Sequence, residues 1–97
     1  MTLAAEKYHL ASSTLAILPR IAVCESDLNP TAKHINKNGS VDFGALQVNN
    51  THKAEMAAMG LDYDDPLDSI QYGVYLASTS GLKPWNSSKS CWSTPIS

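Results

Sequence analysis

The stretch CESDLNPTAKHINKNGSVDFGALQVN, residues 24–49, decides how this chain is organised. Its first carboxylate, Glu25, follows an apolar run in which Ile21 and Ala22 occupy adjoining helical positions. A polar, turn-rich loop comes next, and Asp42 then lies on a short segment with strand-like alternation. The sequence therefore predicts two carboxylates in unlike surroundings, one at a helix end and one on a strand.

Glu25 and Asp42 are the candidate catalytic residues. Cleavage of a glycosidic bond uses a protonated carboxylic acid and an ionised carboxylate. An apolar helix should raise the pKa of Glu25, whereas a polar strand should leave Asp42 ionised. The alternative for Glu25 is a salt bridge at a helix end. The alternative for Asp42 is a side chain that accepts hydrogen bonds from nearby backbone N–H groups.

Two motifs in this stretch, Glu25-Ser26-x-x-Asn29-Pro30 and Asn38-Gly39-Ser40-x-Asp42-x-Gly44-x-x-Gln47-Val48-Asn49, resemble the active-site stretch of the lysozyme superfamily. They are similar to the lytic transglycosylases, especially the small ones that serve secretion systems, and to the c-type lysozymes. The spacing of 17 residues between the carboxylates is similar to that in c-type lysozymes. The resemblance implies an α+β, mainly α-helical, lysozyme-like fold with a minimal β-hairpin beside the cleft, in a single domain over residues 1–97.

The resemblance also implies a reaction, namely cleavage of the MurNAc-β-1,4-GlcNAc bond of peptidoglycan, with Glu25 as the acid. In the transglycosylase route, Glu25 then takes the proton of the sugar's own 6-hydroxyl and a 1,6-anhydro ring closes. In the lysozyme route, Asp42 stabilises or captures the glycosyl centre and water completes hydrolysis. The Asp65-Pro66 helix start and the acidic net charge favour the transglycosylase. The first alternative is a hydrolytic muramidase, which includes the case of a phage-derived enzyme. The second alternative is a non-catalytic wall-docking module. Neither route needs a cofactor or a metal.

Further residues are candidates for substrate binding. Gln47 and Asn49 lie two positions apart, so a strand would direct both to one face, where amides can bond acetamido and hydroxyl groups. Local backbone contacts are the alternative for these amides. Trp85 and Trp92 suit either stacking on sugar rings or a place in the core. Ser26 is included because the motif contains it.

One feature of the transglycosylases is missing from this chain. They carry a Tyr-Asn-x-Gly segment whose tyrosine reaches the catalytic glutamate, whereas this chain has Trp85-Asn86-Ser87-Ser88. Tyr72 and Tyr75, which lie about a helical turn apart, are the candidates to orient Glu25 in its place, and Tyr72 is also a candidate for substrate binding.

The two cysteines, Cys24 and Cys91, are candidates for a disulfide. In the c-type lysozymes the helix that bears the glutamate is tied to the C-terminal region from a cysteine one helical turn earlier. Two unpaired buried cysteines are the alternative.

The composition is that of one small globular domain of 97 residues, with a net charge of −2 and an isoelectric point near 5.8. This charge argues against nucleic acid as a partner. The expected partner is the glycan strand of peptidoglycan. We expect the protein to be a monomer that acts together with a secretion or phage apparatus. No membrane span and no signal peptide are recognisable. We expect a periplasmic, secreted or phage-delivered protein.

Periodicity predicts helices over residues 2–12, from a cap at residues 12–14 to Asn29-Pro30, from a Thr51 cap to Gly60, and from Pro66 to Gly81. Pro19 should lie in the first turn of the second helix or bend it. A hairpin should turn at residues 36–40.

Four acids, Asp62, Asp64, Asp65 and Asp68, favour solvated carboxylates at a helix start over a calcium site. The histidines, His9, His34 and His52, show no metal spacing and are predicted to lie on the surface.

Overall fold

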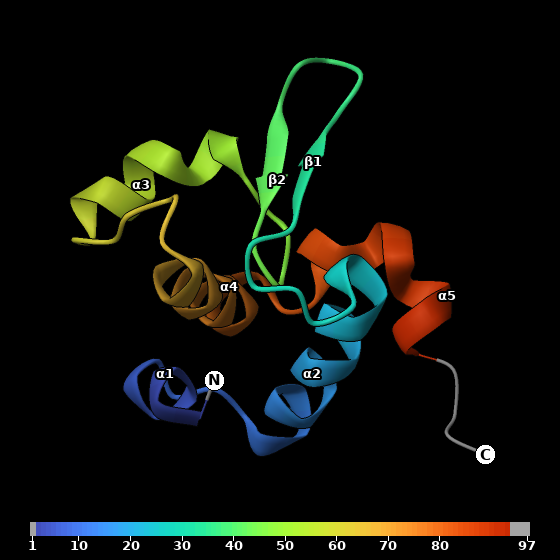
Figure 1. Ribbon diagram of the computed structural model, residues 1–97. Helices are drawn as coiled ribbons and strands as arrows, with labels where there is room; N and C mark the ends of the chain where they lie inside the picture. Colours follow the sequence, from blue (N-terminus) through green and yellow to red (C-terminus); the bar gives the residue numbers. More distant parts are fainter. Residues whose placement is uncertain (1, 94–97) are drawn as a thin grey trace.

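The computed structural model describes residues 2–93, a mainly helical chain with a small antiparallel sheet, and this confirms the α+β class (Figure 1). A β-hairpin projects from the helical body in this view, with helix α3 on one side of its base and helix α5 on the other. The elements, in order, are α1 (Thr2–Lys7), α2 (Ser12–Ser26), β1 (Lys33–Ile35), β2 (Val41–Phe43), β3 (Val48–Asn49), the 3₁₀ helix η1 (Asn50–His52), α3 (Lys53–Ala58), α4 (Pro66–Ser80), η2 (Lys83–Ser88) and α5 (Lys89–Trp92).

Helix α2 carries Glu25 in its last turn, as predicted, but both of its ends differ from the prediction. Ala11 occupies the N-cap position without a side-chain hydrogen bond, so the predicted Ser/Thr cap is wrong. Pro19 lies inside the helix and not in its first turn, where it removes one backbone hydrogen bond. Two left-handed residues, Asp27 and Leu28, end the helix before Asn29-Pro30 is reached.

The sheet has three strands in the order β1-β2-β3, so the predicted hairpin is confirmed, and β3 covers part of the stretch from Gln47 to Asn49 that was considered as a strand. Strand β3 has only two residues, too few to show an alternating pattern in a sequence. Asp42 pairs with Asn49 across β2 and β3, and Phe43 pairs with Val48. Directly paired residues share a face of a sheet. Phe43 and Val48 are buried, whereas the Asp42–Asn49 pair lies on the other face.

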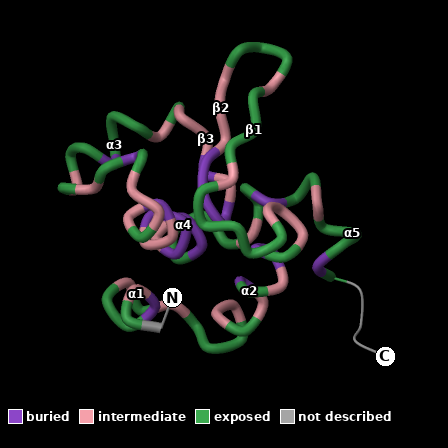
Figure 2. Tube along the Cα trace, in the orientation of Figure 1, coloured by how far each residue is buried: buried purple, intermediate pink, exposed green. Residues whose placement is uncertain are grey.

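Helix α4 is the centre of the core, and it begins as predicted. The Asp65 side chain accepts hydrogen bonds from the N–H groups of Leu67 and Asp68, and Pro66 takes the first helical position. Figure 2 shows the buried residues concentrated on α4 and on the strand beside it. Six residues of this helix are buried, namely Ser69, Tyr72, Gly73, Val74, Leu76 and Ala77.

Helix α3 follows a 3₁₀ turn, and the predicted Thr51 cap is wrong. Asn49 caps this turn instead, because its side-chain oxygen accepts a hydrogen bond from the backbone N–H of Thr51. Gly60 ends the segment with a positive φ of 79°.

The end of β2 and the segment that joins it to β3 are held together by side chains from several elements. Ser69 of α4 donates to the Phe43 carbonyl, Ser26 of α2 donates to the Ala45 carbonyl, and Trp85 of η2 donates to the Leu46 carbonyl. Each of these bonds is 3.0 Å or shorter. Because three helical elements converge on four consecutive residues, this segment fixes where the two central strands lie relative to α2 and α4.

Substitution of Gly44 in this segment should lower the stability of the fold measurably. It has a φ of +90°, and an added Cβ would lie 2.5 Å from the Ser69 Oγ. We expect Gly44→Ala to combine backbone strain with overpacking and to lower the free energy of unfolding by about 2–4 kcal/mol. Gly39→Ala is the matched control, because Gly39 has a similar φ of +86° and open space around it. Chemical denaturation that gave equal losses for both variants would contradict the close contact at Gly44.

Candidate active site

A cleft of about 230 Å³ contains both candidate catalytic residues. Helix α2 contributes Glu25, strand β2 contributes Asp42, and η2 contributes three further lining residues. The residues that line the cleft are Glu25, Asp42, Gln47, Val48, Asn49, His52, Leu76, Pro84, Trp85 and Ser87.

Glu25 is a half-buried carboxyl group with a raised pKa. Burial is the largest cause, because loss of water raises the pKa above its ordinary value of 4.5. A hydrogen bond from Ser88 acts in the opposite direction, and the negative charge of Asp42 raises the pKa again. A carboxyl group that holds its proton more tightly than usual is suited to act as a general acid.

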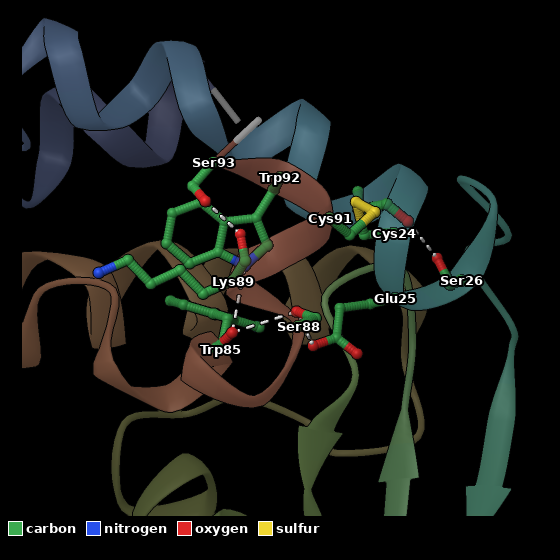
Figure 3. The surroundings of a disulfide bond; sticks show 10 residues. Cys24, Glu25, Ser26, Trp85, Ser88, Lys89, Cys91, Trp92 and Ser93 are labelled. Atoms are coloured by element: carbon green, nitrogen blue, oxygen red, sulfur yellow. Dashed lines mark hydrogen bonds between the residues drawn. A yellow bond between two sulfur atoms is a disulfide. The ribbon is translucent and has the colours of Figure 1, made fainter. Parts of the chain in front are cut away.

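Ser88 contacts Glu25 directly, as Figure 3 shows. Its hydroxyl donates a hydrogen bond of 3.0 Å to the Glu25 Oε1 and lies 3.1 Å from the Trp85 carbonyl. Ser88 thus occupies the place that we predicted for Tyr72 or Tyr75. Serine is common in loops, and 63 residues separate Ser88 from Glu25, so the sequence carries no signal that joins them.

The disulfide between Cys24 and Cys91 lies next to this contact (Figure 3). The two Cα atoms are 6.1 Å apart, within the usual range for a disulfide. Cys24 directly precedes Glu25, and Cys91 follows Ser88 by three residues. The covalent bond therefore fastens the segment that carries Ser88 to the helix that carries Glu25.

Asp42 is held in place by amides. The Nδ2 of Asn49 donates to the Asp42 Oδ1 at 2.8 Å, and the Nδ2 of Asn36 donates to the Oδ2 at 3.2 Å. The first contact follows from the pairing of the two residues across β2 and β3. With both oxygens engaged, the carboxylate is fixed in orientation on the cleft wall.

Three of the five predicted substrate-binding residues, Gln47, Asn49 and Trp85, line the cleft. The side chain of each of these three residues is already hydrogen-bonded to another group of the protein. The Gln47 amide donates to the carbonyls of Ala32 and Gly44, and Gln47 itself has a positive φ of 52°. Gln47 therefore lies in the turn before β3, and the predicted strand geometry for it is wrong. Trp85 is buried, with its indole N–H bonded to the Leu46 carbonyl.

The other two predicted substrate-binding residues, Ser26 and Tyr72, lie outside the cleft lining, and we correct both assignments. The Ser26 hydroxyl bridges the carbonyls of Ala22 and Ala45. Tyr72 is fully buried, and its hydroxyl donates to Glu55 and lies near His52. Burial raises its pKa, and the hydrogen bond to Glu55 raises it further.

His52 was predicted to be a surface residue without a site role. It is half-buried at the end of η1, directly before α3, and it lines the cleft. The sequence around His52 has neither the spacing of a metal-binding site nor a catalytic motif. Its place in the cleft follows from its packing against Tyr72, with ring centroids 5.3 Å apart.

The remaining candidates have structural roles. Trp92 is buried, and its indole N–H donates to the Trp85 carbonyl. In the acidic cluster, three carboxylates accept hydrogen bonds from backbone N–H groups around the start of α4. These carboxylates belong to Asp62, Asp65 and Asp68.

Two substitutions should move the pKa of Glu25 in opposite directions. Ser88→Ala removes a hydrogen bond that favours the charged form, so this pKa should rise, whereas Asp42→Asn removes a negative charge, so it should fall. Because a general acid must be protonated, the alkaline limb of activity should move to higher pH in the first variant and to lower pH in the second. Carbon-13 NMR titration of the Glu25 carboxyl measures the pKa directly. Ser87→Ala, a substitution of a neighbouring cleft residue, is the control, and shifts of equal sign would contradict the assignment.

Comparison with known proteins gives distant relatives. The chain is 35% identical over 77 residues to Protein IpgF of Shigella flexneri and, to the same extent, to Protein IpgF of Shigella sonnei. The match covers 75% of this chain and 49% of each relative, so the chain spans about half the length of the curated relatives it matches. No family model matches the chain. Within residues 2–93, no helix has the length and apolar character needed to cross a membrane.

Proposed function

We propose that this protein cleaves the MurNAc-β-1,4-GlcNAc bond of peptidoglycan as a lytic transglycosylase with a lysozyme-like fold. The observation that carries the proposal is Glu25, a half-buried carboxyl group of raised pKa that shares one cleft with Asp42. Glu25 donates its proton to the glycosidic oxygen as the bond breaks through an oxocarbenium-like state. Glu25 then takes the proton of the sugar's 6-hydroxyl, and this oxygen closes the 1,6-anhydro ring on the anomeric carbon.

One feature of the site supports the transglycosylase route. Both oxygens of Asp42 accept hydrogen bonds from amides, an arrangement that suits a fixed charge better than a carboxylate free to attack the anomeric carbon. Glu25 accepts a hydrogen bond from the neutral hydroxyl group of Ser88, so it can receive a proton after it has given one away, as both routes require.

Hydrolysis by a lysozyme mechanism is the second candidate. One observation favours it: the negative charge of Asp42 is close enough to Glu25 to raise its pKa. Such a charge also stabilises an oxocarbenium-like centre formed between the two groups, and water would then complete the reaction.

Digestion of purified peptidoglycan, followed by mass spectrometry of the muropeptides, tests the proposal. Anhydro products lack the one water that hydrolysis adds, so their masses identify the route. We expect anhydro products, and we expect Asp42→Asn to retain part of the activity. Reducing-end products together with an inactive Asp42→Asn variant would establish the lysozyme route. Absence of any cleavage by the wild-type chain would contradict the enzymatic assignment.

A further inference from the structure

His52, Tyr72 and Glu55 form a hydrogen-bonded chain that leads from the core to the cleft. The Tyr72 hydroxyl donates to the Glu55 Oε1, and the Tyr72 hydroxyl oxygen lies 3.0 Å from the His52 Nδ1. Tyr72 is fully buried, whereas His52 lines the cleft that contains Glu25 and Asp42. Neither route to bond cleavage uses these three residues.

Counting protons along this chain determines the tautomer of His52. A phenol has one proton to donate, and a carboxylate can only accept. Because the Tyr72 proton goes to Glu55, the Tyr72 oxygen meets the His52 Nδ1 as an acceptor, and Nδ1 must carry the proton. In the neutral imidazole the other nitrogen, Nε2, then has a free lone pair. No described residue donates to Nε2 within residues 2–93.

We propose that the His52 Nε2 accepts a hydrogen bond from the bound sugar, either from a hydroxyl or from an acetamido N–H, and that Tyr72 and Glu55 set the tautomer that makes this possible. This inference rests on the proposed function and adds a substrate-binding residue to it. Carbohydrates offer many O–H donors, and an aminosugar adds the acetamido N–H. A cleft that already holds two carboxylates at Glu25 and Asp42 gains a neutral acceptor from His52 without a further negative charge.

The tautomer can be measured in the free protein, without an activity assay. Two-bond ¹H–¹⁵N correlation spectra distinguish the two ring nitrogens of a neutral histidine. We expect His52 to show a protonated Nδ1. Tyr72→Phe, which removes the acceptor for this proton, should shift His52 towards the Nε2–H form that free imidazole favours in water. A protonated Nε2 in the wild-type chain would overturn the inference.

Binding of triacetylchitotriose, measured by isothermal titration calorimetry, tests the contact itself. His52→Asn keeps an N–H donor near Tyr72, because the Asn Nδ2 lies close to the place of the His Nδ1, but it removes Nε2. We expect this variant to bind the trisaccharide about 3- to 10-fold more weakly, as loss of one hydrogen bond implies. His9→Asn is the matched control, because His9 is exposed in the turn after α1, outside the cleft lining, and the affinity of this variant should equal that of the wild type.

The outcomes separate this inference from the proposed function. Equal affinity of His52→Asn and the wild type would overturn the inference, even if peptidoglycan cleavage is observed. Weaker binding by His52→Asn alone supports the inference, even if no cleavage is observed and the enzymatic proposal fails. Absence of trisaccharide binding by the wild-type chain would overturn the inference as well.

Discussion

Replacing Glu25 with Gln is expected to lower peptidoglycan cleavage by about 10²- to 10⁴-fold while the fold stays intact. The amide has the shape of the carboxyl group, and its oxygen can still accept the hydrogen bond from the Ser88 hydroxyl. It has no proton of suitable acidity to give to the glycosidic oxygen. Release of soluble muropeptides from purified peptidoglycan, compared at equal protein concentration, measures the loss.

The control for this substitution is Glu6→Gln, which changes the net charge by the same amount on the exposed surface of α1, outside the cleft lining. Its activity should match that of the wild type. Thermal unfolding of Glu25→Gln should stay close to the wild-type curve, which separates loss of chemistry from loss of structure. A Glu25→Gln protein with near wild-type activity would disprove the assignment of Glu25 as the acid.

Removal of the disulfide should produce the largest change in stability. The bond joins residues 67 positions apart, and closure of a loop of that length is worth about 4 kcal/mol in the chain-entropy model. Small domains are stabilised by roughly 5–15 kcal/mol in total, so this is a large share. The double variant Cys24→Ser and Cys91→Ser should therefore unfold at a clearly lower denaturant concentration. It should also lose activity, because Ser88 would no longer be held against Glu25.

A reductant provides the control for the disulfide experiment. Dithiothreitol should lower the melting temperature of the wild-type chain and leave that of the double serine variant unchanged. Mass measurement under non-reducing conditions should find no free thiols at Cys24 or Cys91. Two reactive thiols in freshly purified native protein would contradict the bond, although the assignment of Glu25 would be unaffected.

Local patterns in the sequence were sufficient for the elements that carry the candidate acid and the core. The apolar run before Glu25 predicted a helix with this residue in its last turn, and the helix ends at Ser26. Asp65-Pro66 predicted the start of α4 because a capping carboxylate and a proline at the first position act within a few residues. The turn around Gly39 likewise predicted the hairpin. These features depend on neighbours in the chain, so they can be recognised in the sequence.

The surroundings of the two carboxylates were decided by the tertiary structure. Asn49 reaches Asp42 because the register of β2 and β3 pairs them, and the two-residue β3 left no periodic signal. Ser88 reaches Glu25 across 63 residues, and His52 joins the cleft only because α4 packs Tyr72 against it. Hydrogen bonds between side chains distant in sequence form only when packing brings their elements together. The sequence by itself thus determined which carboxylates are candidates and on which elements they lie, whereas packing alone decided the groups that hold and tune them.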